Sequence, residues 1–129
     1  MLSSVRNIGH MIVLCDDLDR MKAFYLDLFH FPIASEKPTG VSLVAGNVRL
    51  GLRKRMRHYD GHGGGPESPG VQIAFPVSPD EVDRCHEQLV EKDVTIVDPP
   101  TNQPWGHRTV YFNDPEGNVL EIYGELGDR

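Results

Sequence analysis

The sequence contains no apolar run near the roughly 18 residues that a membrane-spanning helix needs. Its first segment, MLSSVRNIGH, has no long apolar stretch of the kind found in secretory signals, so we expect a cytoplasmic protein. Cysteine is scarce as well, because only Cys15 and Cys85 are present and they form no C-x-x-C motif. Both lie in apolar segments, which is typical of reduced, buried cysteines in the cytosol.

Positive charge is also in short supply. The chain has 13 Lys and Arg residues against 19 Asp and Glu residues, which gives a formal net charge of -6. Nucleic-acid binding needs a basic surface, so neither nucleic acid nor a membrane is an expected partner. The one basic run, RKRMR at 53–57, is interpreted as a solvated loop end. The 129 residues, 39% of them hydrophobic, suit one compact domain with a modest core.

The first half of the chain predicts a strand, a helix and three more strands. The apolar run at 8–15 is typical of a buried strand. A helix follows and should end near His30, because Pro32 comes soon after. Further strands are expected at 33–35, 41–45 and 48–52, the last two joined by a Gly-Asn turn.

The second half predicts the same order of elements. A strand at 71–77 leads into Ser78-Pro79-Asp80-Glu81, which has the pattern of a helix-capping box with proline at the first helical position. An apolar stripe then indicates a helix. Three strands are expected after it, at 94–97, 107–113 and 119–123.

The chain therefore reads as an internal repeat of two βαβββ modules within a single domain, residues 1–129. Module one spans about 6–53 and module two about 70–124. The Gly- and Pro-rich stretch at 54–69 has the composition of a linker. The triplet GNV occurs at 46–48 and again at 117–119, near the last strand of each module.

Overlaying the modules raises a question about Glu121, which interrupts an apolar run. The strand starts pair His10 with Gln72, and the two GNV triplets pair Leu50 with Glu121. A buried carboxylate is costly unless a partner or a metal compensates its charge. Imidazole, carboxylate and the weaker amide oxygen can all be metal ligands, so three of these four residues could meet at one centre.

The whole pattern resembles a known superfamily. The double βαβββ plan, with HMIVLCDDLDRMKAFYLDLF near the start and PWGHRTVYFNDPEGNVLEIY near the end, is similar to the vicinal oxygen chelate superfamily of glyoxalases, bleomycin resistance proteins and extradiol dioxygenases. The resemblance covers residues 6–124. It implies an α+β fold in which the two modules form a cupped, partly open barrel of mixed sheet, and a homodimer whose modules pair within one chain or swap between two.

The resemblance also implies a chemistry. Carried over residue by residue, the family's ligand positions are His10, Leu50, Gln72 and Glu121, of which Leu50 cannot coordinate. A divalent ion (Ni, Zn, Mn or Fe) held by the other three would leave positions for two neighbouring oxygens of a small substrate, and Glu121 would be the candidate general base. Lyase, isomerase or transferase chemistry would fit. The substrate would also meet Leu50 and the predicted cavity rim, formed by Trp105, His107 and Arg108.

Two other interpretations stay open. The first is a metal-free protein of the bleomycin-resistance type, which would sequester a planar or hydrophobic molecule against Trp105. Leu50 and Gln72 favour this alternative, while the count of three capable donors favours the enzyme. The second is a dimeric structural module without a small ligand. A separate metal site in the Gly-rich loop is a weaker hypothesis, because no scaffold would hold its donors, His58, Asp60 and His62.

Overall fold

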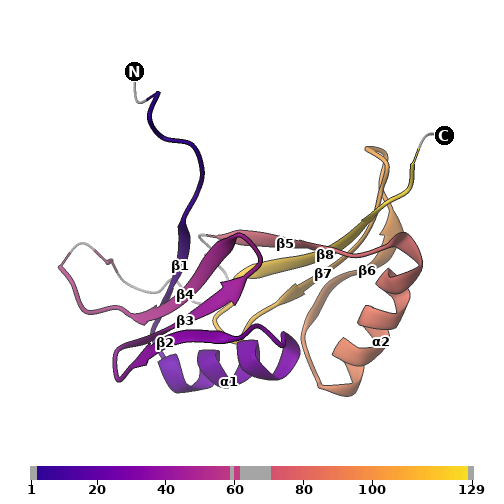
Figure 1. The fold of residues 1–129 in the computed structure, drawn as a ribbon. Helices are drawn as coiled ribbons and strands as arrows, with labels where there is room; N and C mark the ends of the chain where they lie inside the picture. The colour runs from indigo at the N-terminus through magenta and orange to yellow at the C-terminus, as the bar shows by residue number, and fades with distance from the viewer. Residues whose placement is uncertain (1–2, 59, 62–70, 128–129) are drawn as a thin grey trace. The chain divides into compact units, whose positions relative to one another are not determined.

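A computed structural model describes residues 3–58, 60–61 and 71–127 (Figure 1). The chain divides into two compact units, Met1–Gly63 and Gly64–Arg129. Within the described residues, no helix is both long enough and apolar enough to cross a membrane.

Unit 1 is a four-stranded mixed sheet with one helix. Its order of elements is β1 (His10–Cys15), α1 (Leu18–Leu28), β2 (Ile33–Lys37), β3 (Gly40–Ala45) and β4 (Val48–Lys54). The strands lie in the order β1-β4-β3-β2, with β1 parallel to β4 and the other pairs antiparallel. The Asp17 carboxylate caps α1 by accepting a hydrogen bond from the backbone N–H of Arg20 at 3.1 Å.

Unit 2 repeats this plan. It consists of β5 (Gln72–Pro76), the 3₁₀ turn η2 (Pro79–Glu81), α2 (Val82–Glu91), β6 (Ile96–Asn102), β7 (His107–Asn113) and β8 (Val119–Glu125). The strand order is β5-β8-β7-β6, and β5 is parallel to β8. The predicted α+β class and the repeated βαβββ order are thus confirmed.

Two local predictions in unit 2 were wrong. The strand predicted at 94–97 is instead β6, which continues through Pro99 and Pro100 with irregular pairing to β7. Proline is tolerated there because β6 is an edge strand, whose outward-facing N–H groups have no neighbouring strand to which they could donate hydrogen bonds. The predicted capping box does not form either, because Ser78 makes no side-chain cap and instead its backbone oxygen accepts from the Glu81 N–H at 2.9 Å.

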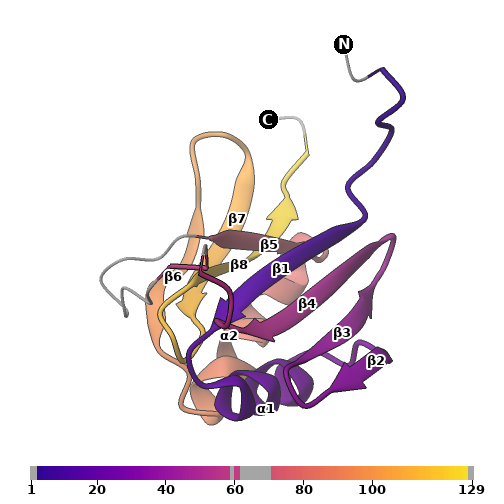
Figure 2. The same cartoon turned by 90° about the vertical axis from the view of Figure 1, so that its left-hand side faces the viewer.

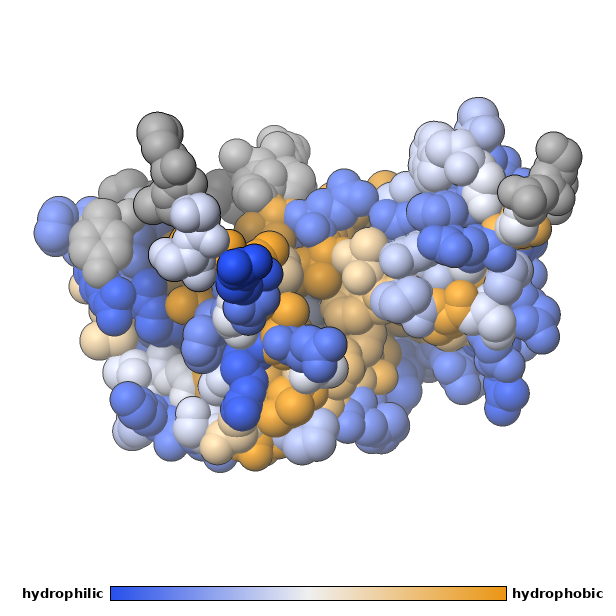
Figure 3. Space-filling view, turned by 45° about the horizontal axis from the view of Figure 1, so that its top comes forward, coloured by the Kyte–Doolittle hydropathy of each residue, from blue (hydrophilic) through white to orange (hydrophobic). Residues whose placement is uncertain are grey.

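Each sheet has a helix on one face (Figures 1 and 2). Met21 and Tyr25 of α1 are completely buried, as are Val110 and Phe112 of β7 beside α2. Burial of such a side chain contributes about 1.5–3 kcal/mol. The opposite face of each sheet, called the open face below, carries the polar residues. Apolar residues also reach the surface among polar ones (Figure 3), and the large exposed ones include Ile12, Ile33, Met56, Val97 and Trp105.

Asp60 organises the chain that leaves β4. Its two carboxylate oxygens each lie 3.0 Å from a terminal nitrogen of Arg53, and one of them accepts hydrogen bonds from the backbone N–H groups of Met56 and Arg57 at 2.9 Å. The hydrogen bonds from Arg53 and from these amides hold the pKa of Asp60 well below its usual value of 3.8. Interpreting 53–57 as a solvated loop end was therefore wrong for Arg53. Of the predicted linker, 59 and 62–69 lie outside the described residues.

Candidate functional site

Glu121 lies on the open face of unit 2 beside Gln72. Parallel pairing of β5 with β8 sets Ala74 opposite Glu121, so Gln72, two residues from Ala74, shares their face. The Gln72 Nε2 donates a hydrogen bond to the Glu121 Oε1 at 3.3 Å. Glu121 is nevertheless only 8% exposed, whereas its neighbours Leu120 and Ile122 point to the helix-covered face. The charged residue within the apolar run is thus a buried carboxylate paired with an exposed amide side chain.

Tyr111 of β7 completes this polar group. It lies directly opposite Glu121 in the antiparallel β7–β8 pair. Burial raises the pKa of Tyr111, and the negative charge of Glu121 and a hydrogen bond between the two side chains raise it further. On the same face and two residues away, the completely buried Thr109 hydroxyl accepts a hydrogen bond from the Gln103 Nε2 at 3.0 Å. A row of hydrogen-bonding side chains therefore follows this face of the sheet.

Tyr111 and Thr109 were not predicted from the sequence. Each is an ordinary strand residue in HRTVYFN, and neither type stands out as a metal ligand. The signal was the alternation of the strand, because residues 107, 109 and 111 must share one face. Once Glu121 was paired with β7, that alternation would have placed Tyr111 beside it.

His10 lies on the open face of unit 1, and the register corrects the residue paired with Glu121. In the β1–β4 pair, Ile12 stands opposite Gly51, just as Ala74 stands opposite Glu121 in unit 2. The counterpart of Glu121 is therefore Gly51. Leu50 points to the helix-covered face and is only 3% exposed, so it lies on the opposite side of the sheet from His10.

The GNV triplets misled the overlay because their turns have different lengths. In unit 1, Ala45 pairs with Val48, which leaves a two-residue connection. In unit 2, Asn113 pairs with Val119 across a longer connection. The triplets are consequently one position out of register, and a shift of one residue moves a strand side chain to the other face.

The three residues predicted at the cavity rim are separated in the structure. His107 is on the open face of unit 2 and stacks on Tyr123, with ring centroids 4.8 Å apart. Trp105 lies in the β6–β7 connection, is 60% exposed and lines a surface hollow together with Leu126. Arg108 faces the α2 side instead.

Arg108 is already engaged by a two-pronged ion pair with Asp83 of α2. Its Nη2 and Nε lie 2.8 and 3.1 Å from the two carboxylate oxygens, and its Nη1 donates to the Asn102 side chain at 2.9 Å. This pair raises the pKa of Arg108 and lowers that of Asp83. Arg108 therefore contributes to holding α2 on the sheet and does not share a face with Glu121.

The donor set fits a divalent ion in part. Within the described ranges, no three His, Cys, Asp or Glu side chains lie close enough together to hold a metal ion. Glu121 and Gln72 nevertheless present one anionic and one neutral donor group side by side on a single face. Hard divalent cations accept such oxygen ligands, provided that the Gln72 amide turns its oxygen toward the ion. Of the alternative loop site, His62 lies outside the described residues, and Asp60 is committed to Arg53.

The fold and the repeated register define a class of protein. The sequence profile described as "Glyoxalase/Bleomycin resistance protein/Dioxygenase superfamily" matches residues 7–122, and the chain belongs to this family. The predicted superfamily resemblance is thereby confirmed.

Individual relatives show which members the chain is similar to. It is 28% identical to the metallothiol transferase FosB of Lysinibacillus sphaericus, over 98% of this chain and 88% of that protein. Among solved structures, a glyoxalase/bleomycin resistance protein/dioxygenase from Nocardioides has a TM-score of 0.84 at 23% identity, covering 97% of this chain and 87% of the other. A lactoylglutathione lyase from Agrobacterium tumefaciens has a TM-score of 0.74 at 24% identity, covering 92% of each.

Proposed function

We propose that this chain is a small-molecule enzyme in which His10, Gln72 and Glu121 hold a divalent metal ion. The observation that carries the proposal is the Gln72–Glu121 pair, a buried carboxylate aimed at an open sheet face with a second oxygen-bearing side chain beside it. Similarity to FosB, whose name describes it as a metallothiol transferase, supports the same reading. The reaction type is lyase, isomerase or transferase chemistry on a substrate with neighbouring oxygens.

Each side chain has a defined task in this proposal. When bound, the ion (Ni, Zn, Mn or Fe) supplies Lewis-acid polarisation of a substrate oxygen. Glu121 is the candidate general base, because it is a buried carboxylate that can accept a proton from the substrate. Tyr111 positions that carboxylate through their shared hydrogen bond. His107 and Trp105 are the candidate substrate contacts of unit 2. Arg108 and Leu50 drop out of the proposal, since both face the helix sides of their sheets.

Glu121→Gln tests the metal assignment. The substitution keeps the side-chain volume and the capacity to bond Gln72, but it removes the charge. We expect wild-type protein from metal-supplemented medium to carry near-stoichiometric metal, and the variant to bind it at least roughly tenfold more weakly. Elemental analysis and metal titration measure this, with circular dichroism to show that the variant is folded.

Glu125→Gln is the matched control, because Glu125 is an exposed carboxylate at the end of the same strand. It should bind metal as the wild type does. Equal metal content in Glu121→Gln and wild type would contradict the ligand assignment. A wild-type protein that takes up no metal on titration would contradict the enzyme proposal as stated.

A metal-free binding protein is the second candidate. It is favoured by the hydrogen bonds that Glu121 already makes with Gln72 and Tyr111, which satisfy the carboxylate without any ion. In that case the open face of unit 2 is the wall of a ligand pocket, and Trp105 offers a ring for stacking. Absence of metal uptake, together with binding of planar apolar ligands that quench Trp105 fluorescence, would select this candidate.

Cytoplasmic location and a homodimer complete the proposal. Both rest on the composition and on family membership. Sedimentation of the purified chain at several concentrations tests the dimer, and a monomer throughout would contradict it.

A further inference from the structure

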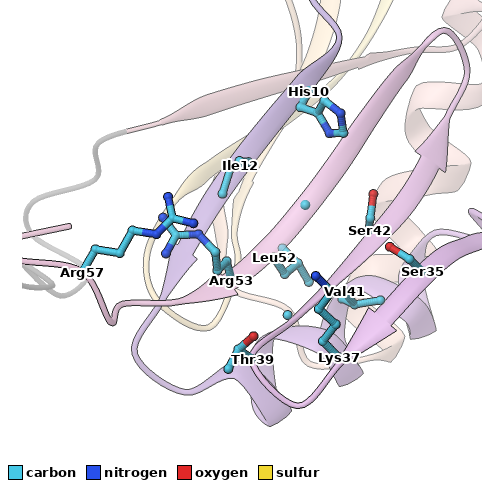
Figure 4. A pocket seen from close by; sticks show the side chains of 12 residues that line it. His10, Ile12, Ser35, Lys37, Thr39, Val41, Ser42, Leu52, Arg53 and Arg57 are labelled. Atoms are coloured by element: carbon cyan, nitrogen blue, oxygen red, sulfur yellow. The ribbon is translucent and has the colours of Figure 1, made fainter. Parts of the chain in front are cut away.

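Unit 1 contains a cavity of about 310 Å³ on its open face (Figure 4). Its walls come from all four strands of the sheet and from the segment that follows β4. His10 and Ile12 of β1 form one side, and Ser35 and Lys37 of β2 form the other. The size is at the lower end of the range of about 300–1,000 Å³ that is typical of ligand sites.

Glycine makes the floor of this cavity. Gly40 and Gly51 lie on the open face of β3 and β4, where any other residue would project a side chain into the space. A Cβ at Gly51 would touch Ile12 at 3.4 Å, and one at Gly40 would come within 2.8 Å of the Leu52 carbonyl oxygen. In unit 2 the position equivalent to Gly51 holds Glu121, so the cavity exists because unit 1 lacks that side chain.

Every charged residue that lines the cavity is basic. These are Lys37, Arg53 and Arg57, and no Asp or Glu is among the lining residues. This is notable in a chain whose net charge is -6. The Asp60 carboxylate accepts two hydrogen bonds of 3.0 Å from Arg53 and holds its guanidinium in place. Within the described residues, Lys37 forms no salt bridge, so its ammonium group is available to a ligand.

Hydroxyl groups stand beside these charges. Ser35 and Ser42 are cross-strand neighbours on β2 and β3, and Figure 4 shows both at the same side of the cavity, with Thr39 near Lys37. An ammonium group with several hydroxyl donors is suited to an oxyanion, because each anionic oxygen can accept a charge-assisted or neutral hydrogen bond.

We propose that this cavity binds the anionic group of a small ligand, a phosphate, phosphonate or carboxylate, with Lys37, Ser35 and Ser42 as its direct contacts. Arg53, whose charge Asp60 balances, and Arg57 also line the cavity. The inference rests on the proposed function only where it assigns the anion to a substrate. The substrate would then be a small, oxygen-rich and negatively charged molecule.

Titration with inorganic phosphate tests the site directly. The protein is first stripped of metal and dialysed, and the titration is followed by NMR at constant ionic strength. We expect saturable shifts at Lys37, Ser35 and Ser42, and about tenfold weaker binding in Lys37→Gln, because a charge-assisted hydrogen bond is lost. Lys54→Gln is the matched control, since it removes the same charge from the same sheet at a residue that does not line the cavity. Equal weakening in both variants, or no saturable shift in the wild type, would overturn the proposal.

Two further arms distinguish the sources of the anion and the two proposals. Methyl phosphate should compete with inorganic phosphate at equal or lower concentration, because a substrate presents its anion on a carbon skeleton. Binding of the free ion alone would overturn the assignment to a substrate. Glu121→Gln should bind phosphate as the wild type does, while Lys37→Gln should keep its metal. Failure of the metal assignment would therefore leave phosphate binding intact, and failure of the anion site would leave metal binding intact.

Discussion

The open faces of the two sheets share one strand order and one register, yet they carry opposite chemistry. At matching positions, unit 1 has Gly51 where unit 2 has Glu121, and Ser42 where unit 2 has Tyr111. Unit 1 therefore has a hollow lined by basic residues, and unit 2 has a carboxylate that fills the same place. The repeat supplies two equivalent faces, and a single small or large residue determines whether each one is a cavity or a ligand platform.

A second comparison concerns the helix-covered faces, which are conserved in character between the units. Leu50 and Leu52 of β4 match Leu120 and Ile122 of β8, and all four are buried. The apolar core is thus repeated while the polar faces diverge. This is expected if packing constrains one face and ligand chemistry the other.

The largest effect is expected at Gly124, where the two units differ in how the chain approaches the sheet. In unit 2, η2 packs so closely that a Cβ at Gly124 would lie 2.5 Å from the Pro79 Cα. The matching residue of unit 1 is the exposed Lys54. Gly124→Ala should lower the free energy of unfolding by about 2–3 kcal/mol, because backbone atoms must shift to admit the methyl group. Urea denaturation measures the change.

Gly9→Ala is the control for that experiment, since a Cβ at Gly9 meets nothing within 4 Å. It should change the stability by less than about 0.5 kcal/mol. Equal stability of Gly124→Ala and wild type would show that η2 does not rest on β8 as described.

The sequence predicted the repeat well and the site less well, for a physical reason. Alternation is a property of a whole segment, so the strand predicted at 107–113 is present as β7. Register depends instead on the lengths of turns, which differ by a few residues between the modules. One such residue was enough to pair Leu50 rather than Gly51 with Glu121. The cavity could not be predicted from the sequence. It forms because Gly40 and Gly51 lie on the same face of the folded sheet and project no side chains into the space.

A smaller effect is expected from two-pronged Arg–Asp pairs, of which unit 1 has a buried example and unit 2 an exposed one. The side chain of Asp60 is 2% exposed and that of Asp83 is 55% exposed. Asp60→Asn should lower the denaturation midpoint clearly at pH 7, because it removes the negative charge and one of the two oxygens that accept hydrogen bonds from Arg53. Asp83→Asn should cost only a few tenths of a kcal/mol, as exposed ion pairs do.

The dependence on pH sharpens this contrast. The pKa of Asp60 is lower in the folded chain than its usual 3.8, so the unfolded chain takes up the proton first as the pH falls. The stability that Asp60 contributes is therefore complete above about pH 5 and declines as the pH falls below 3.8 toward the folded value. Asp60→Asn should lose less stability than the wild type between pH 5 and pH 3. A parallel decline in both proteins would contradict the pairing.

A further modest effect is expected at Tyr111 and at Ser42, its equivalent in unit 1. Tyr111→Phe removes a hydroxyl that is hydrogen-bonded to Glu121 and should cost about 1 kcal/mol. Ser42→Ala is the matched change in unit 1 and should cost less, since Ser42 lies at a cavity.

Because burial and Glu121 raise the pKa of Tyr111, the unfolded chain loses the phenolic proton first as the pH rises above 10. Above pH 10 the wild type should therefore lose stability, whereas Tyr111→Phe has no phenol to titrate at this position. The difference in unfolding free energy between the two proteins should narrow. Urea midpoints of the three proteins at pH 8 and pH 10.5 measure this, and a gap that widens would mean that Tyr111 does not face the Glu121 carboxylate.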